Sequence, residues 1–215
     1  ICFPKGNLAP EGSVVKSTSI DPSVLDNDGV YRKTGPARMF TNEPDAIKAI
    51  KGQTDHPVKP GDIVILCSRG PMGTGMEETA QLTLALKYIS WGKDVTLLTD
   101  ARFSGVSTGA CVGHVGPEAL SGGPIGKVRD GDTIQVIIDR NKLEGSIDLI
   151  GEDEQRFSPQ EGIEILASRS SRENLKPDSR LPEDSRLWAA LQNTSGGTWG
   201  GCVFDVDSIV DKLNS

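Results

Sequence analysis

The sequence predicts an α/β fold, and three observations support this class. Two continuously apolar segments, Asp62 to Ser68 and Val95 to Thr99, are typical of strands buried on both faces of a sheet. Between them, Met76 to Trp91 carries apolar residues at helical spacing, so strand, helix and strand follow one another. The chain also has 25 glycines and 5% aromatic residues, which favours a turn-rich, strand-containing fold over a helical bundle.

Before the first buried strand, residues 1–42 are predicted to be mostly loop, with one short strand from Ser13 to Lys16. Glu43 to Lys51 is predicted to be a short amphipathic helix, because its apolar residues recur on one face. Asn42 is a suitable N-cap, and acidic residues fill the first turn.

After the second buried strand, Lys127 to Lys142 has the pattern of a β-hairpin whose turn is Asp130-Gly131-Asp132. Glu152 to Pro182 is polar and lacks strong periodicity, so we predict a surface excursion there. Leu187 to Leu191 could form one or two helical turns, and Val206 to Leu213 is predicted to be a closing helix.

The length of 215 residues fits a domain core in 1–150, with 151–215 as a polar excursion and helical extension packed on the same domain. A net charge of −7 without a basic cluster argues against nucleic-acid binding. No apolar run has the length of a membrane span, and no secretory signal is present, so we expect a cytoplasmic protein. The chain does not begin with Met, which favours a piece of a longer polypeptide.

The four cysteines are Cys2, Cys67, Cys111 and Cys202, and their spacing matches neither a zinc nor an iron–sulfur motif. Reduced thiols are therefore expected. Cys67 lies in an apolar strand and is predicted to be a buried small residue. Cys111 is close enough in sequence to line a pocket with the serine discussed next, although ordinary packing is the simpler interpretation.

The loop after the second buried strand is the first candidate for a functional site. It holds Ser104 in a glycine-flanked turn, with Arg102 before it and two further hydroxyls, Ser107 and Thr108, after it. Glycine allows both the sharp turn and the close approach of a ligand. An ordinary strand-to-loop turn is the alternative. His114 has no acidic partner in sequence, so the pattern does not indicate a hydrolase triad.

The loop after the first buried strand is the second candidate. Gly70 to Gly75 is neither a dinucleotide fingerprint nor a phosphate loop, although a helix start there could receive a carboxylate. Thr74 and Glu77 fit a capping box, which leaves Glu78 as the better candidate for metal binding or chemistry, and a carboxylate suits Mg²⁺. If the two strands are parallel neighbours, both loops lie at the same sheet edge, where open α/β sheets bind ligands.

Seven short segments between Gly6 and Asp139 are specific as an ordered set. They are Gly6-Asn7-Leu8-Ala9-Pro10, Gly35-Pro36-Ala37-Arg38, Gly70-Pro71 to Gly75-Met76, Thr99 to Gly105, Cys111 to Val115 with Pro117-Glu118-Ala119, Gly122 to Ile125, and Val128 to Asp132. This set resembles the C-terminal domain of the dihydroxy-acid dehydratase / phosphogluconate dehydratase family. Within this family, the chain is most similar to the sugar-acid branch, the xylonate dehydratases. The segments that carry this similarity are Gly70 to Thr79, Leu187 to Leu191 and Ser195 to Gly201.

The resemblance implies a swivelling β/β/α domain, with a barrel-like mixed sheet flanked by helices. It also implies a hydro-lyase that converts a 2,3-dihydroxy sugar acid to a 2-keto-3-deoxy acid with an iron–sulfur cluster and Mg²⁺. In such an enzyme Ser104 would match the catalytic base and Glu78 a Mg²⁺ ligand. Ser107 and Thr108 would be substrate contacts, and Arg102 would either bind the substrate carboxylate or orient the turn.

No cysteine here matches the family's cluster ligands, which lie in an N-terminal domain. We therefore expect that missing domain as the partner, a homo-oligomer at full length, and an isolated chain that is inactive and holds neither cluster nor Mg²⁺. Two alternatives stay open: a stand-alone domain that binds small carboxylates, and a module that docks on a partner without catalysis. Dehydratase activity on mixing with the missing half would separate the enzyme from both alternatives.

Overall fold

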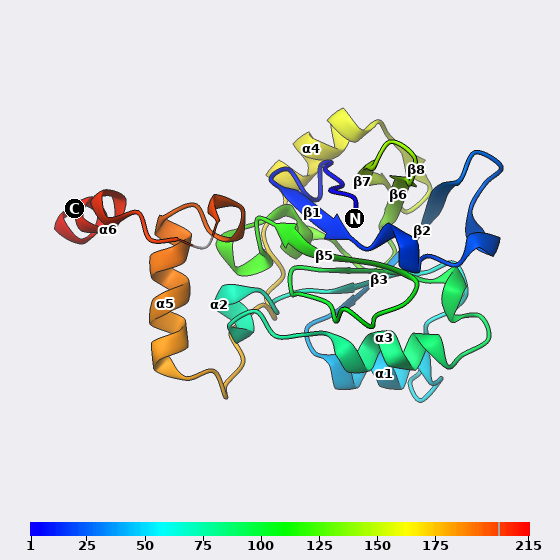
Figure 1. The fold of residues 1–215 in the computed structure, drawn as a ribbon, viewed down its shortest axis with the longest axis horizontal. Helices are drawn as coiled ribbons and strands as arrows, with labels where there is room; N and C mark the ends of the chain where they lie inside the picture. The colour runs from blue at the N-terminus through cyan, green and yellow to red at the C-terminus, as the bar shows by residue number, and fades with distance from the viewer. Residues whose placement is uncertain (202) are drawn as a thin grey trace.

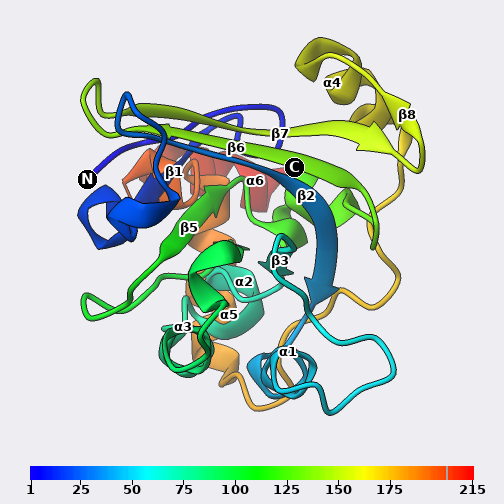
Figure 2. The same cartoon turned by 90° about the vertical axis from the view of Figure 1, so that its right-hand side faces the viewer.

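The computed structural model describes residues 1–201 and 203–215 (Figure 1). Eight strands form one mixed sheet in the order β1-β5-β4-β3-β2-β6-β7-β8. The sheet curls into a half-barrel flanked by helices (Figure 2), which confirms the predicted α/β class and its barrel-like mixed sheet. The strands are β1 (Gly12–Val15), β2 (Val30–Phe40), β3 (Ile63–Leu66), β4 (Thr96–Thr99), β5 (Ala110–Gly116), β6 (Thr133–Asp139), β7 (Glu144–Glu152) and β8 (Gln155–Arg156).

The parallel half of the sheet contains β2, β3, β4 and β5. Every residue of β3 and β4 is buried, because helices cover one face and the barrel interior covers the other. The covering helices are α1 (Glu43–Ile50) and α3 (Ala80–Lys87), which lie side by side below the sheet in Figure 1. The predicted N-cap is confirmed, since the Asn42 side chain accepts a hydrogen bond from the Asp45 amide at 2.9 Å.

The long strand β2 joins the two halves of the sheet. Its first part, Val30 to Pro36, pairs antiparallel with β6, and its second part, Ala37 to Phe40, pairs parallel with β3. At the change of partner, a Cβ on Gly35 would collide with the Gly61 carbonyl. Our assignment of this region to loop was wrong, because a Gly-Pro pair in the middle of a strand conceals its pattern.

The N-terminal segment bridges the two edges of the half-barrel. The Cys2 amide donates to the Val15 carbonyl of β1 at 2.9 Å, and the Lys5 amide donates to the Gly145 carbonyl of β7 at 3.1 Å. Apolar side chains from β2, β3, β5, β6 and β7 fill the space that this segment closes. Among the largest fully buried residues there are Leu8, Tyr31, Ile63, Ile65, Ile134 and Ile138.

Two predicted boundaries differ from the structure. The helix expected over residues 76–91 is the shorter α3, and a separate single turn, α2 (Pro71–Thr74), precedes it. The two are separated because Gly75 and Met76 both adopt φ of 67°. The hairpin turn also lies elsewhere: β6 pairs with β7 across residues 140–143 rather than at 130–132. The Asp130-Gly131 turn instead precedes β6, and the Asp132 carboxylate accepts from the Arg129 amide at 2.8 Å.

The segment predicted as a surface excursion contains a helix, α4 (Pro159–Ser168), that packs on β7. Ser158 and Glu161 form its capping box. Two further helices follow, α5 (Glu183–Thr194) and α6 (Val206–Asn214), and α6 projects from the body in Figure 1. The closing helix is confirmed, and α5 is longer than predicted. The division at residue 150 stays a prediction, and Cys202 lies outside the described residues.

Among the described residues, every helix falls short of the length and apolar character needed to cross a membrane.

A buried ion pair ties the segment after α4 to the turn before β6. The Arg169 guanidinium donates to both carboxylate oxygens of Asp132, at 2.6 and 2.9 Å, and both side chains are at most 3% exposed.

Arg169→Ala leaves the Asp132 carboxylate buried without its partner, so we expect a loss of about 3–5 kcal/mol in the free energy of unfolding. Urea unfolding measures this. Arg172→Ala is the matched control, since its contact to Asp130 is more exposed and is expected to contribute about 1 kcal/mol or less. Equal losses in the two variants would contradict the assignment.

Candidate functional site

The loops that follow β3 and β4 meet at one edge of the sheet. The Thr79 amide donates to the Arg102 carbonyl at 3.0 Å, and the Arg102 amide donates to the Glu77 carbonyl at 3.3 Å. Glu78 and Arg102 therefore face each other as a parallel bridge. This pairing confirms the expectation that the two candidate loops share an edge.

A buried carboxylate, Asp100, holds these loops in place. One of its oxygens accepts from the Ser68 and Ala119 amides, and the other accepts from the Arg69 amide, all at 3.0 Å. Burial raises the pKa of Asp100, and the three backbone hydrogen bonds act in the opposite direction. Asp100 falls within the segment Thr99 to Gly105, and no role was predicted for it from the sequence. A carboxylate directly after a fully buried strand is the signal that could have identified it.

Ser104 lies on the turn that follows β4 and is partly exposed. Its hydroxyl accepts a hydrogen bond from the Val106 amide at 3.4 Å, and its carbonyl accepts from the Ser107 amide at 2.9 Å. The Lys16 ammonium anchors the turn through the Gly105 carbonyl at 2.8 Å. In the described part of the chain, neither a histidine nor a carboxylate is hydrogen-bonded to the Ser104 hydroxyl.

Arg102 and Glu78 lie beside the serine turn, and both side chains are partly exposed to solvent. The Arg102 Nε donates to the Met76 carbonyl at 3.0 Å, and another guanidinium nitrogen lies 3.8 Å from a Glu78 carboxylate oxygen. Their side chains are 54% and 38% exposed. The edge thus presents one cation and one carboxylate to any ligand that reaches the turn.

Glu77 has a structural role, but a different one from the predicted capping box. Its amide does donate to the Thr74 hydroxyl at 3.1 Å, yet α3 begins only at Ala80. The carboxylate instead binds the Arg69 guanidinium through two hydrogen bonds of 2.7 and 2.6 Å. The Arg69 side chain is only 8% exposed and also lies 3.4 Å from Asp178. Glu77 is thus engaged by a nearly buried arginine, whereas the assignment of the more exposed Glu78 as a metal ligand stays a prediction.

The two other predicted substrate contacts lie apart from Arg102 and Glu78. Ser107 is buried, and its hydroxyl is hydrogen-bonded to the Thr83 hydroxyl of α3 at 3.0 Å. Thr108 is exposed and lines a cavity of about 890 Å³ between α3 and residues 18–22. The lining of that cavity includes Cys111 but neither Ser104 nor Glu78. The roles proposed for Ser107 and Thr108 stay predictions.

His114 lies in β5 with φ of 53°, and its amide donates to the Ala101 carbonyl at 2.8 Å. Its ring meets the Phe103 ring edge-on, with 6.4 Å between centroids. Burial, together with the positive charge of Arg102, lowers the pKa of His114. The imidazole thus lies next to the serine loop as a neutral packing group.

Glu118, which sequence reasoning missed, joins α2 to the segment after β5. Both of its carboxylate oxygens accept from the Met72 amide, at 2.9 and 3.1 Å, and the Ser121 hydroxyl donates at 3.4 Å. Burial raises the pKa of Glu118 to about 7, against these hydrogen bonds. A Cβ on Gly70 would collide with this carboxylate, so a glycine is needed there.

The cysteines among residues 1–201 and 203–215 do not fit an iron–sulfur cluster. The described cysteines, Cys2, Cys67 and Cys111, are buried at separate places in the fold, and burial raises the pKa of Cys67 and of Cys111 to about 12. Within the described residues, no three His, Cys, Asp or Glu side chains are arranged to bind a metal ion. Glu78 could supply one carboxylate ligand to Mg²⁺, which needs further ligands from elsewhere.

The fold and the edge define an α/β domain that presents a serine turn, an arginine and a carboxylate at one edge of its sheet. A family model described as dihydroxy-acid/6-phosphogluconate dehydratase C-terminal matches residues 1–177. The chain belongs to this family, as the sequence motifs predicted.

Named relatives extend the match. The chain is 57% identical over 215 residues to D-xylonate dehydratase YagF of Escherichia coli (strain K12), covering 100% of this chain and 32% of that protein. It is 56% identical over 211 residues to D-xylonate dehydratase YjhG of the same strain, covering 97% of this chain and 32% of that protein. Dihydroxy-acid dehydratase of Leifsonia xyli subsp. xyli (strain CTCB07) is 42% identical over 178 residues, covering 82% of this chain and 29% of that protein. The chain thus spans about a third of the length of these relatives.

The raised pKa of Glu118 predicts a pH-dependent stability. Because the folded pKa of about 7 exceeds the ordinary 4.5, the native state binds more protons than the unfolded state between these values. The contribution of Glu118 is therefore fully present below about pH 4.5 and is lost as the pH rises through about 7. Glu118→Gln removes this titration, and the free energy of unfolding should fall less between pH ~5 and ~7.5 than in the parent. Urea titrations at both pH values test this, and an identical fall in both proteins would contradict it.

Proposed function

We propose that this chain is the serine-bearing C-terminal part of a hydro-lyase that dehydrates a sugar acid such as D-xylonate. The observation that carries the proposal is the backbone pairing of residues 77–79 with Arg102, which places Glu78, Arg102 and the Ser104 turn at one edge. The sugar-acid preference is supported by the D-xylonate dehydratase relatives, one of which matches all 215 residues, whereas the family model ends at residue 177.

In this proposal each residue at the edge has one task. Arg102 binds the substrate carboxylate, because its guanidinium is exposed and only loosely paired with Glu78. Ser104, once ionised, takes the proton from C2 of the acid. The electron pair of that C–H bond forms the C2–C3 double bond, and the C3 hydroxyl takes up the proton that Ser104 removed and leaves as water, which returns the serine to its ionised form. The enol then becomes the 2-keto-3-deoxy acid by moving its hydroxyl proton to C3.

A free serine hydroxyl is too weak a base for this step, and its hydrogen bond from the Val106 amide does not supply a proton acceptor. A bound divalent metal ion would lower the pKa of such a hydroxyl through its positive charge. Glu78 is the residue of this chain that we propose as a Mg²⁺ ligand. The three cysteines that the structure describes do not fit an iron–sulfur cluster, so we assign the proposed cluster to another part of the full-length polypeptide.

The proposed partner is accordingly the remaining two-thirds of the polypeptide length seen in the relatives. The isolated chain is then expected to be inactive, and the full-length enzyme is proposed to be a homo-oligomer. A cytoplasmic location is supported by three unpaired cysteines among the described residues.

Removing the Ser104 hydroxyl should abolish turnover without unfolding the protein. Ser104→Ala in the full-length polypeptide is expected to lower kcat on D-xylonate by ~10²-fold or more, since a general base of this kind contributes at least that much. Steady-state kinetics, iron and sulfide analysis, and thermal unfolding are measured together. Ser168→Ala, at an exposed position of α4, is the control and should behave as the parent. A Ser104→Ala enzyme with near-normal kcat would remove this serine from the mechanism, and a parent without dehydratase activity on sugar acids would favour a carboxylate-binding or docking domain.

The two adjacent acids should separate into a structural and a metal-binding residue. Glu77→Gln weakens the pairing of a nearly buried arginine, so we expect it to cost about 1–3 kcal/mol of stability with an unchanged Mg²⁺ requirement. Glu78→Gln removes a charge that Mg²⁺ needs and should raise that requirement or abolish activity, with a stability change within about 0.5 kcal/mol. Activity against Mg²⁺ concentration and thermal unfolding are compared for both full-length variants. The reverse assignment of the two effects would show that Glu77 is the ligand, and no metal effect in either variant would place all the ligands in another part of the polypeptide.

A further inference from the structure

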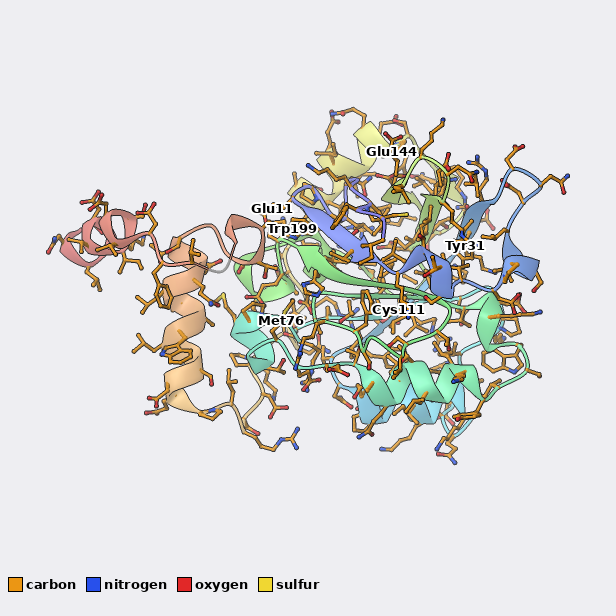
Figure 3. The ribbon with its side chains drawn as sticks, viewed as in Figure 1. Glu11, Tyr31, Met76, Cys111, Glu144 and Trp199 are labelled. Atoms are coloured by element: carbon orange, nitrogen blue, oxygen red, sulfur yellow. The ribbon has the colours of Figure 1, made fainter. Side chains whose placement is uncertain are left out.

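Trp199 packs against two glycines that face each other in the strand pair β1 and β5. It is carried by the short turn η6 (Thr198–Gly200) and lies close to Glu11 at the end of that strand pair (Figure 3). Gly12 and Gly116 are paired across the two strands. A Cβ on Gly12 would lie 3.0 Å from the indole, and one on Gly116 would lie 2.5 Å from the indole nitrogen. Any larger residue at Gly116 would therefore displace the ring.

The indole also fixes the backbone that carries the serine loop. Its Nε1 donates to the His114 carbonyl at 3.0 Å, and the His114 amide donates to the Ala101 carbonyl at 2.8 Å. Ala101 immediately precedes Arg102, so two hydrogen bonds in series connect Trp199 to the start of the candidate site. Gly113 adds to this contact, since a Cβ there would lie 2.6 Å from the Phe103 ring.

A second contact from the same C-terminal segment reaches the other loop. The Asp178 amide donates to the Gly73 carbonyl at 2.8 Å, and its carboxylate lies 3.4 Å from the Arg69 guanidinium. Arg69 in turn holds Glu77, the neighbour of Glu78. Each of the two loops that form the site is thus contacted by a residue that lies beyond residue 177, where the family model ends.

We propose that Trp199 is a positioning residue for the Ser104 loop, and that Asp178 has the same part for the Glu78 loop. The inference rests on the proposed function. We call the contact of Trp199 with β5 the brace. Because a D-xylonate dehydratase matches all 215 residues while the family model stops at 177, well before Trp199, we assign this brace to the sugar-acid dehydratases rather than to the whole family.

The experiment uses the full-length polypeptide that carries this chain, with Trp199→Ala, Trp199→Phe and the matched control Trp188→Ala. Trp188 lies on α5 in the same segment and is 64% exposed. Small displacements of reacting groups cost up to ~10²-fold in rate, so Trp199→Ala should lower kcat on D-xylonate by ~10- to 100-fold with a smaller change in KM. Trp199→Phe keeps part of the ring packing, so its kcat should lie between those of the parent and of Trp199→Ala. The kcat of Trp188→Ala should stay within about twofold of the parent value.

Hydrogen exchange supplies a readout that does not depend on activity. In Trp199→Ala, peptides that cover β5 should exchange faster because the hydrogen bonds at His114 are loosened, whereas peptides that cover β6 should be unchanged. Unchanged kcat or unchanged β5 exchange in a folded Trp199→Ala protein would overturn the brace. If the Ala variant does not fold, Trp199→Phe decides by the same two measurements. A parent that lacks sugar-acid dehydratase activity would refute the proposed function, and the exchange measurement would still test the brace by itself.

Discussion

The buried carboxylate of Asp100 is the constraint on which the site depends. A charged group inside a protein is costly unless its oxygens are hydrogen-bonded, and Asp100 receives three backbone N–H groups. Those donors belong to the segments that follow β3 and β5, while Asp100 itself is the first residue after β4. One side chain thereby ties together the three chain segments that leave this edge of the parallel sheet. The loops can carry glycines and positive φ values because their ends are fixed by this carboxylate.

The predictable part of the fold is the part whose signal is local. Strands β3 and β4 are apolar throughout, since both faces are covered, and α1 has an amphipathic pattern with a capping asparagine. The shared edge of the two candidate loops followed from these elements, because a helix that connects parallel strands brings their carboxyl ends to one side. Strands β2 and β5 were missed because Gly35-Pro36 and the glycines of Ala110 to Gly116 weaken the alternation that strands normally show.

The missed parts of the site are contacts between residues far apart in sequence. Glu118 binds Met72, Asp178 lies beside Arg69, and Trp199 binds His114, at separations of 46, 109 and 85 residues. Each such partner is chosen by the tertiary fold, and the local pattern around it has another plausible use. Thr74 and Glu77 are an example. Their spacing is that of a capping box, but the nearly buried Arg69 forms a stronger, bidentate pair with the Glu77 carboxylate.

The arrangement separates positioning from activation. Arg102, Glu78 and the Ser104 turn are held by backbone hydrogen bonds, whereas the Ser104 hydroxyl itself accepts one long hydrogen bond, from Val106. On the proposed function, a hydroxyl in this state is unreactive by itself, and its activation comes from the metal-bearing part of the polypeptide. When that part closes over the edge, the loops are already ordered by Asp100 and, on our inference, by Trp199 and Asp178. Closure then does not have to order these loops, and more of the binding free energy is left for stabilising the transition state.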